Sequence, residues 1–238
     1  MAGHSHWKNI KRTKEADSLK RSLAFAKIGK TISILVKEGG KDLNQNPQLR
    51  LMVEKARELN VPKENIERAI KKGAGELKDG KTLESFTFEA YGPGGFAFIA
   101  EGITDNKNRI VSEFKKILTD FSGKIAETGS VQWMFERKSQ VSIETDFSEE
   151  IELYAIELGA ENIEFKDDCF FLTFPVEKTE EAKRKIKEKF SKQAESSLVW
   201  EPKDTVEISE DDLLKTEKMF DEINSKEDIQ EIYSNLKK

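Results

Sequence analysis

The hydrophobic pattern of this chain changes its period at a glycine-rich polar segment, residues 73–81 (GAGELKDGK). Before this segment, apolar residues recur at spacings of three, four and seven, which is typical of amphipathic helices. After it, short aromatic-rich runs with the pattern of strands alternate with further helical stretches. The pattern therefore predicts a multidomain α+β protein whose first domain is all helical.

Three helices are expected before the change of period. The first covers residues 18–36, where the apolar positions share one face. The second begins at Asn46-Pro47, an N-cap followed by the residue best tolerated at the first helical position. The third follows Pro62. Short connections between three amphipathic helices predict a small bundle, the N-terminal domain of residues 1–75.

A strand hairpin and a helix are expected next. Residues 85–91 and 96–103 are aromatic-rich and flank the sequence GPGG, which predicts a hairpin connection. The same GPGG sequence could cradle a phosphate with its amides, but a turn is the simpler interpretation. The polar segment 104–109 (TDNKNR) precedes a helical pattern, so Asp105 or Asn106 is expected to cap that helix.

The patterns between residues 139 and 200 follow the order β-α-β-β-α-β, which is typical of a ferredoxin-like domain. We expect this domain to span residues 138–203 and to be inserted into a middle α/β domain. The middle domain would comprise residues 82–137 and 204–238, because its first segment supplies only one helix to cover its sheet. The expected fold is thus a three-helix bundle followed by two α/β domains.

Two helices are expected after Pro202. Each has a capping-box signature, Ser209 with Asp212 and Ser225 with Asp228. In the second, apolar residues between positions 229 and 236 fall on one stripe of a helix. We expect these C-terminal helices to cover the middle sheet.

Charge is segregated along the chain. Lys and Arg number 17 against 8 Asp and Glu through Gly75, whereas the remainder holds 23 against 37. Such a division favours one surface for a polyanion and another for solvent or a different partner, and nucleic acid is the leading polyanion. The formal net charge of −5 disfavours indiscriminate coating of nucleic acid, because the acidic part is repelled.

The basic positions of the N-terminal domain are the candidate phosphate contacts. Trp7 lies among them and could stack on an exposed base, while Lys107 and Arg109 lie where a helix N-terminus would favour phosphate. A solvated helical face is the competing interpretation of the same charges. The residues expected to bind nucleic acid are Trp7, Lys8, Lys11, Arg12, Lys14, Lys20, Arg21, Arg50, Lys71, Lys72, Lys107 and Arg109.

The chain lacks the residue patterns of most enzyme classes. His4 and His6 are the only histidines, so Ser-His and Cys-His catalysis is excluded from the folded part of the chain beyond residue 6, and an H-x-H pair alone is a poor metal site. Walker, dinucleotide and zinc-hydrolase signatures are absent. We therefore expect no enzymatic activity, no cofactor, no metal and no small-molecule substrate. A carboxylate-based hydrolase stays open, because pairs arise by chance among 45 acidic residues.

Location follows from cysteine content and hydropathy. The single cysteine, Cys169, rules out an intramolecular disulfide framework and is expected to be a buried, inert thiol. No run approaches the roughly 18 apolar residues of a membrane span. We expect a cytoplasmic protein without a membrane partner; the basic N-terminus leaves an organellar transit peptide as a second interpretation.

Six motifs resemble one known family. In chain order they are MAGHSHWKNIK, EGGKDLNQNPQLR, NVPKENIERAIKKGAGE, FEAYGPGG, TDNKNR and ETGSVQWMFERK. Together they resemble, over residues 1–138, the YebC family of transcriptional regulators and translational activators. The resemblance implies three domains, a cytoplasmic or mitochondrial location and no enzymatic activity. It also implies a role linked to nucleic acid, as a DNA-binding regulator of transcription or as a protein that acts with the ribosome.

The primary hypothesis is a non-enzymatic, nucleic-acid-binding regulator of gene expression. Charge does not choose between DNA and ribosomal RNA, because both present phosphates. The second hypothesis is a protein-interaction adaptor in which the basic segment only keeps the protein soluble. The third is the carboxylate-based hydrolase.

Overall fold

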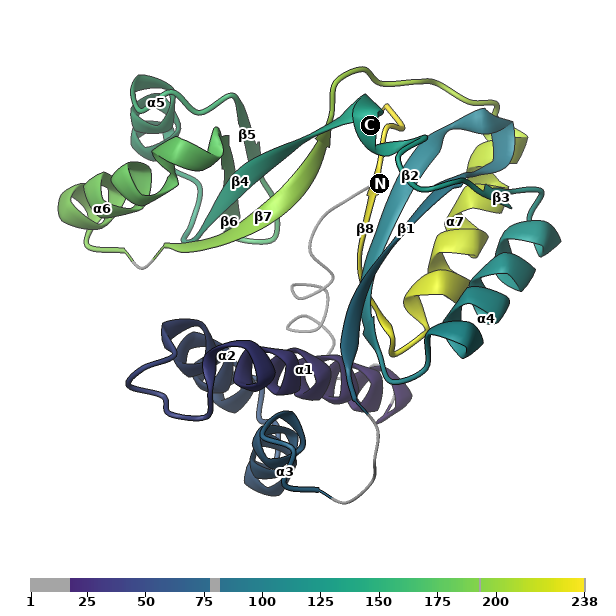
Figure 1. Cartoon of the computed structure of the whole chain (residues 1–238). Helices are drawn as coiled ribbons and strands as arrows, with labels where there is room; N and C mark the ends of the chain where they lie inside the picture. Colours follow the sequence, from purple (N-terminus) through teal and green to yellow (C-terminus); the bar gives the residue numbers. More distant parts are fainter. Residues whose placement is uncertain (1–17, 78–81, 193, 238) are drawn as a thin grey trace. The chain divides into compact units, whose positions relative to one another are not determined.

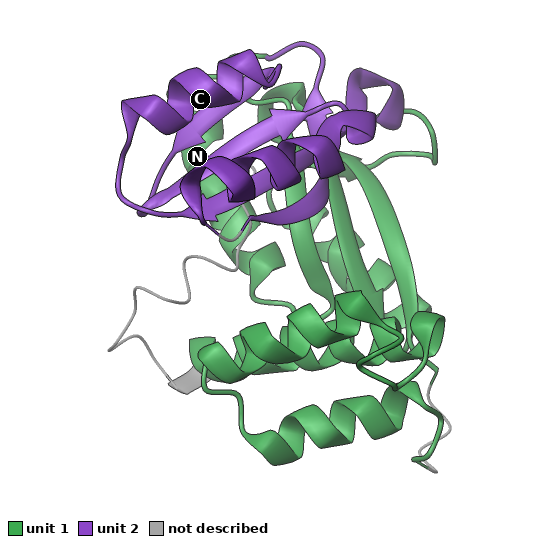
Figure 2. Cartoon of the chain, turned by 90° about the vertical axis from the view of Figure 1, so that its left-hand side faces the viewer, with its two compact units in different colours: residues 1–131, 206–238 green, residues 132–205 purple. Residues whose placement is uncertain are grey.

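The structure is a computed structural model that describes residues 18–77, 82–192 and 194–237 of the 238-residue chain. The chain packs as two compact units, coloured separately in Figure 2. Unit 1 combines residues 1–131 with 206–238, and unit 2 is residues 132–205. The α+β fold class is confirmed. The finer division into three domains at the boundaries given above stays a prediction.

Unit 1 holds the N-terminal helices and one four-stranded sheet with its helices (Figure 1). Its elements are α1 (Ser18–Gly39), α2 (Pro47–Glu58), α3 (Lys63–Gly73), β1 (Glu84–Tyr91), η1 (Pro93–Gly95), β2 (Ala97–Thr104), α4 (Lys107–Asp120), β3 (Lys124–Ile125), α7 (Glu210–Asn224) and β8 (Ile229–Ser234). Unit 2 contains η2 (Gln132–Met134), β4 (Phe135–Glu144), α5 (Glu149–Glu157), β5 (Asn162–Phe165), β6 (Cys169–Phe174), η3 (Val176–Lys178), α6 (Thr179–Phe190) and β7 (Glu195–Pro202).

The three predicted N-terminal helices are confirmed. Asn46 caps α2, since its side-chain oxygen accepts the Leu49 N–H at 3.0 Å. The helices enclose one apolar cluster, in which Ile28, Ile32 and Leu49 are fully buried. Gly73 ends α3 as expected and also permits close packing, because a Cβ there would lie 2.3 Å from the Ser33 carbonyl oxygen.

The sheet of unit 1 has the antiparallel order β3-β1-β2-β8, and α4 and α7 cover one of its faces (Figure 1). Its core is rich in aromatic side chains, including the fully buried Phe96, Phe98 and Phe114. The predicted hairpin is confirmed: β1 and β2 pair through Tyr91 and Ala97 across the GPGG turn. The predicted helix from Ser209 is α7, and it covers the middle sheet as expected.

The second predicted C-terminal helix is wrong. Residues 229–234 form β8, which pairs antiparallel with β2. The local capping signature of Ser225 and Asp228 is outweighed because β8 satisfies backbone groups along the edge of β2 that would otherwise be unpaired. The Asp228 side chain contacts cations on other elements instead of capping a helix.

Unit 2 has the predicted ferredoxin-like order, β4-α5-β5-β6-α6-β7, with the antiparallel sheet order β5-β6-β4-β7. Phe170, Leu172 and Phe174 of β6 pack with residues of α5 and α6 in a single apolar cluster. Cys169 begins β6 and is fully buried, as expected from the sequence.

Candidate nucleic-acid interface

The first described turns of α1 present positive charge to solvent. Lys20 and Arg21 are exposed. Residues 18–37 contain no Asp or Glu, so no acid within this part of the helix neutralises them. Two exposed cations in a helical segment that itself contains no acid are suited to contacting phosphates through charge rather than base identity.

The predicted cations of α2 and α3 are also largely accessible. Arg50 and Lys71 are exposed, whereas Lys72 is half-buried. Lys71 and Lys72 lie in the last turn of α3, where cations also complement the negative end of the helix dipole. Their placement therefore fits both a phosphate contact and a structural role. Five further predicted residues lie outside the described part of the chain: Trp7, Lys8, Lys11, Arg12 and Lys14.

The two predicted cations of α4 differ in their surroundings. Asn106 caps α4, as one of the two expected caps, by accepting the Arg109 N–H at 3.0 Å. Lys107 is exposed beside this cap. The Arg109 guanidinium instead contacts carboxylates: Nη2 lies 3.2 Å from Asp105 Oδ1 and 2.9 Å from Asp228 Oδ2. Arg109 is therefore engaged within the protein while 39% of its side chain stays exposed.

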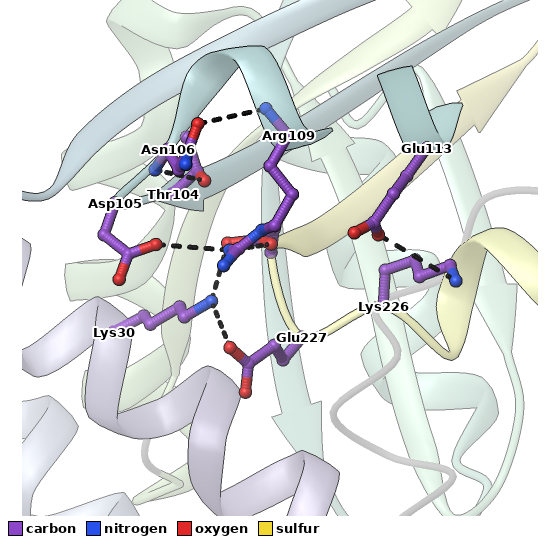
Figure 3. Close-up of polar contacts among 9 residues, drawn as sticks. Lys30, Thr104, Asp105, Asn106, Arg109, Glu113, Lys226 and Glu227 are labelled. Carbon is purple, nitrogen blue, oxygen red and sulfur yellow. Dashed lines mark hydrogen bonds and ion pairs between the residues drawn. The ribbon is translucent and has the colours of Figure 1, made fainter. Parts of the chain in front are cut away.

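Lys30 of α1 joins the same group of charges (Figure 3). Its Nζ lies 2.7 Å from Asp228 Oδ1 and 3.0 Å from Glu227 Oε1. Only 12% of the Lys30 side chain and 5% of that of Asp228 are exposed. Lys30 and Glu227 were not predicted from the sequence, and Asp228 was predicted only as part of a capping box, since a charge count gives no information about the partner of each charge.

Two other α1 lysines point toward the sheet. Lys37 Nζ donates to the Leu83 carbonyl oxygen at 2.8 Å. Lys27 is buried, and its Nζ has no hydrogen-bond partner among the described residues. Burial lowers the pKa of Lys27 to about 8, and the nearby Lys30 lowers it as well, while the charge of Glu231 on β8 opposes the shift. The face of α1 that contacts the sheet therefore carries charged side chains as well as the buried apolar Ile34, which packs with Leu83 and Ile103.

The described residues contain no group of three or more His, Cys, Asp or Glu side chains placed to hold a metal ion. Within the same residues, no helix has the length and apolar content to cross a membrane. The buried Cys169 is inaccessible to a substrate.

Comparisons with known proteins agree along the whole chain. The family profile described as "TACO1/YebC protein N-terminal domain" matches residues 5–76, and "TACO1/YebC second and third domain" matches residues 83–236. Proteins named "Probable transcriptional regulatory protein" are similar over 99% of this chain. The one from Fervidobacterium nodosum is 41% identical, with 94% of its length covered, and the one from Halothermothrix orenii is 39% identical, with 95% covered.

A solved structure has the same fold. The crystal structure of a conserved hypothetical protein from Aquifex aeolicus superposes with a TM-score of 0.84 at 33% identity. The match covers 95% of this chain and 94% of that protein.

Proposed function

The chain belongs to the TACO1/YebC family, and from this premise we propose that it is a non-enzymatic regulator of gene expression that binds nucleic acid through its N-terminal helices. Its relatives are named as transcriptional regulatory proteins, which supports a regulator of the YebC type. Binding to DNA, or to ribosomal RNA with an effect on translation, is the part of this function that we add.

The exposed cations at the start of α1 are the observation that carries the proposal. Lys20 and Arg21 have no acidic neighbour within the helix before Glu38. The acidic excess lies in the rest of the chain; the first turn of α5, for example, holds three glutamates. A polyanion is attracted to the basic segment and repelled by the acidic ones, which disfavours indiscriminate coating of nucleic acid.

Salt dependence of binding tests this proposal. Affinity of the full chain for a DNA duplex and for a structured ribosomal RNA fragment would be measured between 50 and 300 mM salt. Each phosphate neutralised contributes about 0.9 to the slope of log affinity against log salt on duplex DNA. We expect a charge reversal of four cations to lower the slope on duplex DNA by about 3.6 and to weaken binding strongly. The reversed residues are Lys11, Arg12, Lys20 and Arg21.

A matched reversal on unit 2 is the control, because it changes the net charge by the same amount. It alters exposed or half-buried cations of α6, namely Lys183, Arg184, Lys187 and Lys189. We expect this variant to keep most of the salt slope of the native chain. Equal losses in both variants would overturn the site assignment, and a native chain without salt-dependent binding would overturn nucleic-acid binding itself.

A second candidate function is favoured by the surface of unit 2. On α5, Leu153 and Ile156 expose 63% and 58% of their surface among glutamates. Exposed apolar side chains on an acidic helix suit a basic protein partner better than a nucleic acid. If the chain is chiefly an adaptor, a protein co-purifies with it after nuclease treatment, and affinity for nucleic acid is micromolar or weaker at physiological salt.

A further inference from the structure

We propose that Asp228 is a positioning residue that joins α1 to α4, so that the exposed cations of the two helices act on nucleic acid as one surface. The inference about binding rests on the proposed function. The joint itself, meaning the contacts of Asp228 with α1 and α4, does not. Asp228 carries a negative charge, and the proposal therefore assigns to an acidic residue a favourable role in binding a polyanion.

Both oxygens of the Asp228 carboxylate are used by cations from different helices. Oδ1 lies 2.7 Å from Lys30 Nζ of α1, and Oδ2 lies 2.9 Å from Arg109 Nη2 of α4. Only 5% of the Asp228 side chain is exposed. Figure 3 shows Lys30 and Arg109 reaching the same point from their two helices. Charge-assisted hydrogen bonds with little exposure to solvent are short and strong, so this carboxylate couples two helices that are far apart in sequence.

The backbone of Asp228 is held as firmly as its side chain. Its carbonyl oxygen accepts the Ile103 N–H of β2 at 2.8 Å. At Gly102, a Cβ would lie 2.1 Å from the same carbonyl oxygen, so the loop before β8 lies directly on β2. Asp228 is therefore held on β2 by its backbone, so a displacement of α1 or α4 would break its side-chain contacts rather than move it. It is a fixed point on the sheet to which Lys30 and Arg109 are attached.

Both helices that contact Asp228, α1 and α4, carry predicted phosphate contacts. Lys107 is exposed in the first turn of α4, where Arg109 is also held by Asp105. Lys20 and Arg21 lie on the same helix as Lys30, and a helix transmits position along its length. Fixing Lys30 and Arg109 to one carboxylate therefore fixes the relative places of the exposed cations. Contacts on a fixed scaffold bind as one multivalent surface, without the entropy loss of arranging them.

Asp228→Asn tests the joint because the loss of a negative charge, considered alone, predicts the opposite change in affinity for nucleic acid. Removal of a negative charge alone would tighten binding to a polyanion. We expect Asp228→Asn to weaken binding to a DNA duplex by about tenfold or more at 100 mM salt, and to lower the salt slope by about 1 to 2. We also expect faster amide hydrogen exchange in α1 and at Ile103. An amide in place of the carboxylate accepts from only one of the two cations and turns its NH₂ group toward the other.

Glu227→Gln is the matched control. Glu227 precedes Asp228 and also contacts Lys30, at 3.0 Å, but it is 52% exposed and forms no ion pair with α4 within the described part of the chain. The change removes the same charge from the same loop while leaving both arms of Asp228 in place. We expect unchanged exchange in α1 and an affinity equal to or slightly above that of the native chain. Equal behaviour of the two variants would overturn the positioning role.

Lys30→Met gives a second test if Asp228→Asn fails to fold. It cuts only the α1 arm and leaves Arg109 between Asp105 and Asp228. Exchange in α1 should accelerate while exchange in α4 stays unchanged; unaltered exchange in α1 would overturn the joint. If Lys30→Met loosens α1 but the native chain shows no salt-dependent binding, the joint stands and the proposed function fails.

Discussion

Two stretches of α1 use the same residue types in different ways. At its start, Lys20 and Arg21 are exposed, and the helix offers no acid to pair with them. In its middle, Lys27 is buried and feels the charge of Glu231 on β8, and Lys30 pairs with Asp228 in the loop before β8. The first pair is available to a polyanion outside the protein. Of the second pair, Lys30 is engaged by carboxylates within the protein, and Lys27 is buried without a hydrogen-bond partner among the described residues.

The comparison teaches that net charge overestimates the size of a phosphate-binding surface. The basic excess of the N-terminal segment includes lysines that hold α1 against the sheet of unit 1. Mutations of the two groups should therefore separate cleanly. Changes in the inward group should alter stability first, and changes in the exposed group should alter binding alone.

Lys27→Met should have the largest effect on stability, and it should be stabilising. The pKa of Lys27 falls from its ordinary value of 10.5 to about 8 in the folded chain, chiefly through burial. Between these values the unfolded chain binds the extra proton, so this lysine makes stability rise with pH from about 8 to 10.5. Below pH 8 its full unfavourable contribution, about 3 kcal/mol at most, is present. Lys27→Met should remove most of it.

Urea unfolding of both proteins at pH 7 and pH 10 would measure this effect. The native chain should gain stability relative to Lys27→Met as the pH rises, until the difference between them nearly closes. A variant that is less stable than the native chain at pH 7 would show that the attraction of Glu231 outweighs the burial of Lys27.

Lys30→Met should lower the stability of the fold, and by less than Lys27→Met raises it. Lys30 forms short ion pairs with Asp228 and Glu227 and is 12% exposed. Loss of a hydrogen bond between charged groups lowers stability by about 1.5 to 3 kcal/mol, and the Arg109 contact that Asp228 keeps should place the loss at the lower end. Thermal unfolding at neutral pH would measure it. An unchanged midpoint of thermal unfolding would mean that the Lys30–Asp228 ion pair orients its two elements without stabilising the fold.

Lys20→Gln should change stability least, by less than about 0.5 kcal/mol, because Lys20 is exposed and forms no ion pair with another described residue. The same variant should lower the salt slope of nucleic-acid binding by about 0.9, the loss of one phosphate contact. Denaturant unfolding and fluorescence anisotropy on the same preparation would give both numbers. A destabilised variant with unaltered binding would reverse the assignment of the two stretches.

Local features of this fold could be predicted from the sequence. The caps Asn46, Asn106 and Ser209 each accept an N–H from three residues further along the chain, so the information lies within one helical turn. The order of strands and helices in unit 2 was predicted in the same way, from short runs whose hydrophobic period alternates between that of a strand and that of a helix. For these elements, local preference and tertiary packing agree.

Features that depend on distant partners could not be predicted. Residues 229–234 carry a pattern that suits a helix, but pairing with β2 makes them a strand. Lys30 and its partner Asp228 are 198 residues apart, and nothing near either residue indicates the other. Of the predicted site, the sequence identified Arg109 as a cation at a helix start but not the carboxylates that engage it.

Crosslinking of the chain to nucleic acid in cells, followed by sequencing of what is recovered, tests the central claim most directly. The charge reversal of Lys11, Arg12, Lys20 and Arg21 is the paired control. We predict that the native chain recovers a defined set of promoter DNA or ribosomal RNA sites and that the reversed variant loses them. Equal recovery by both proteins, or recovery of neither kind of nucleic acid, would contradict the account.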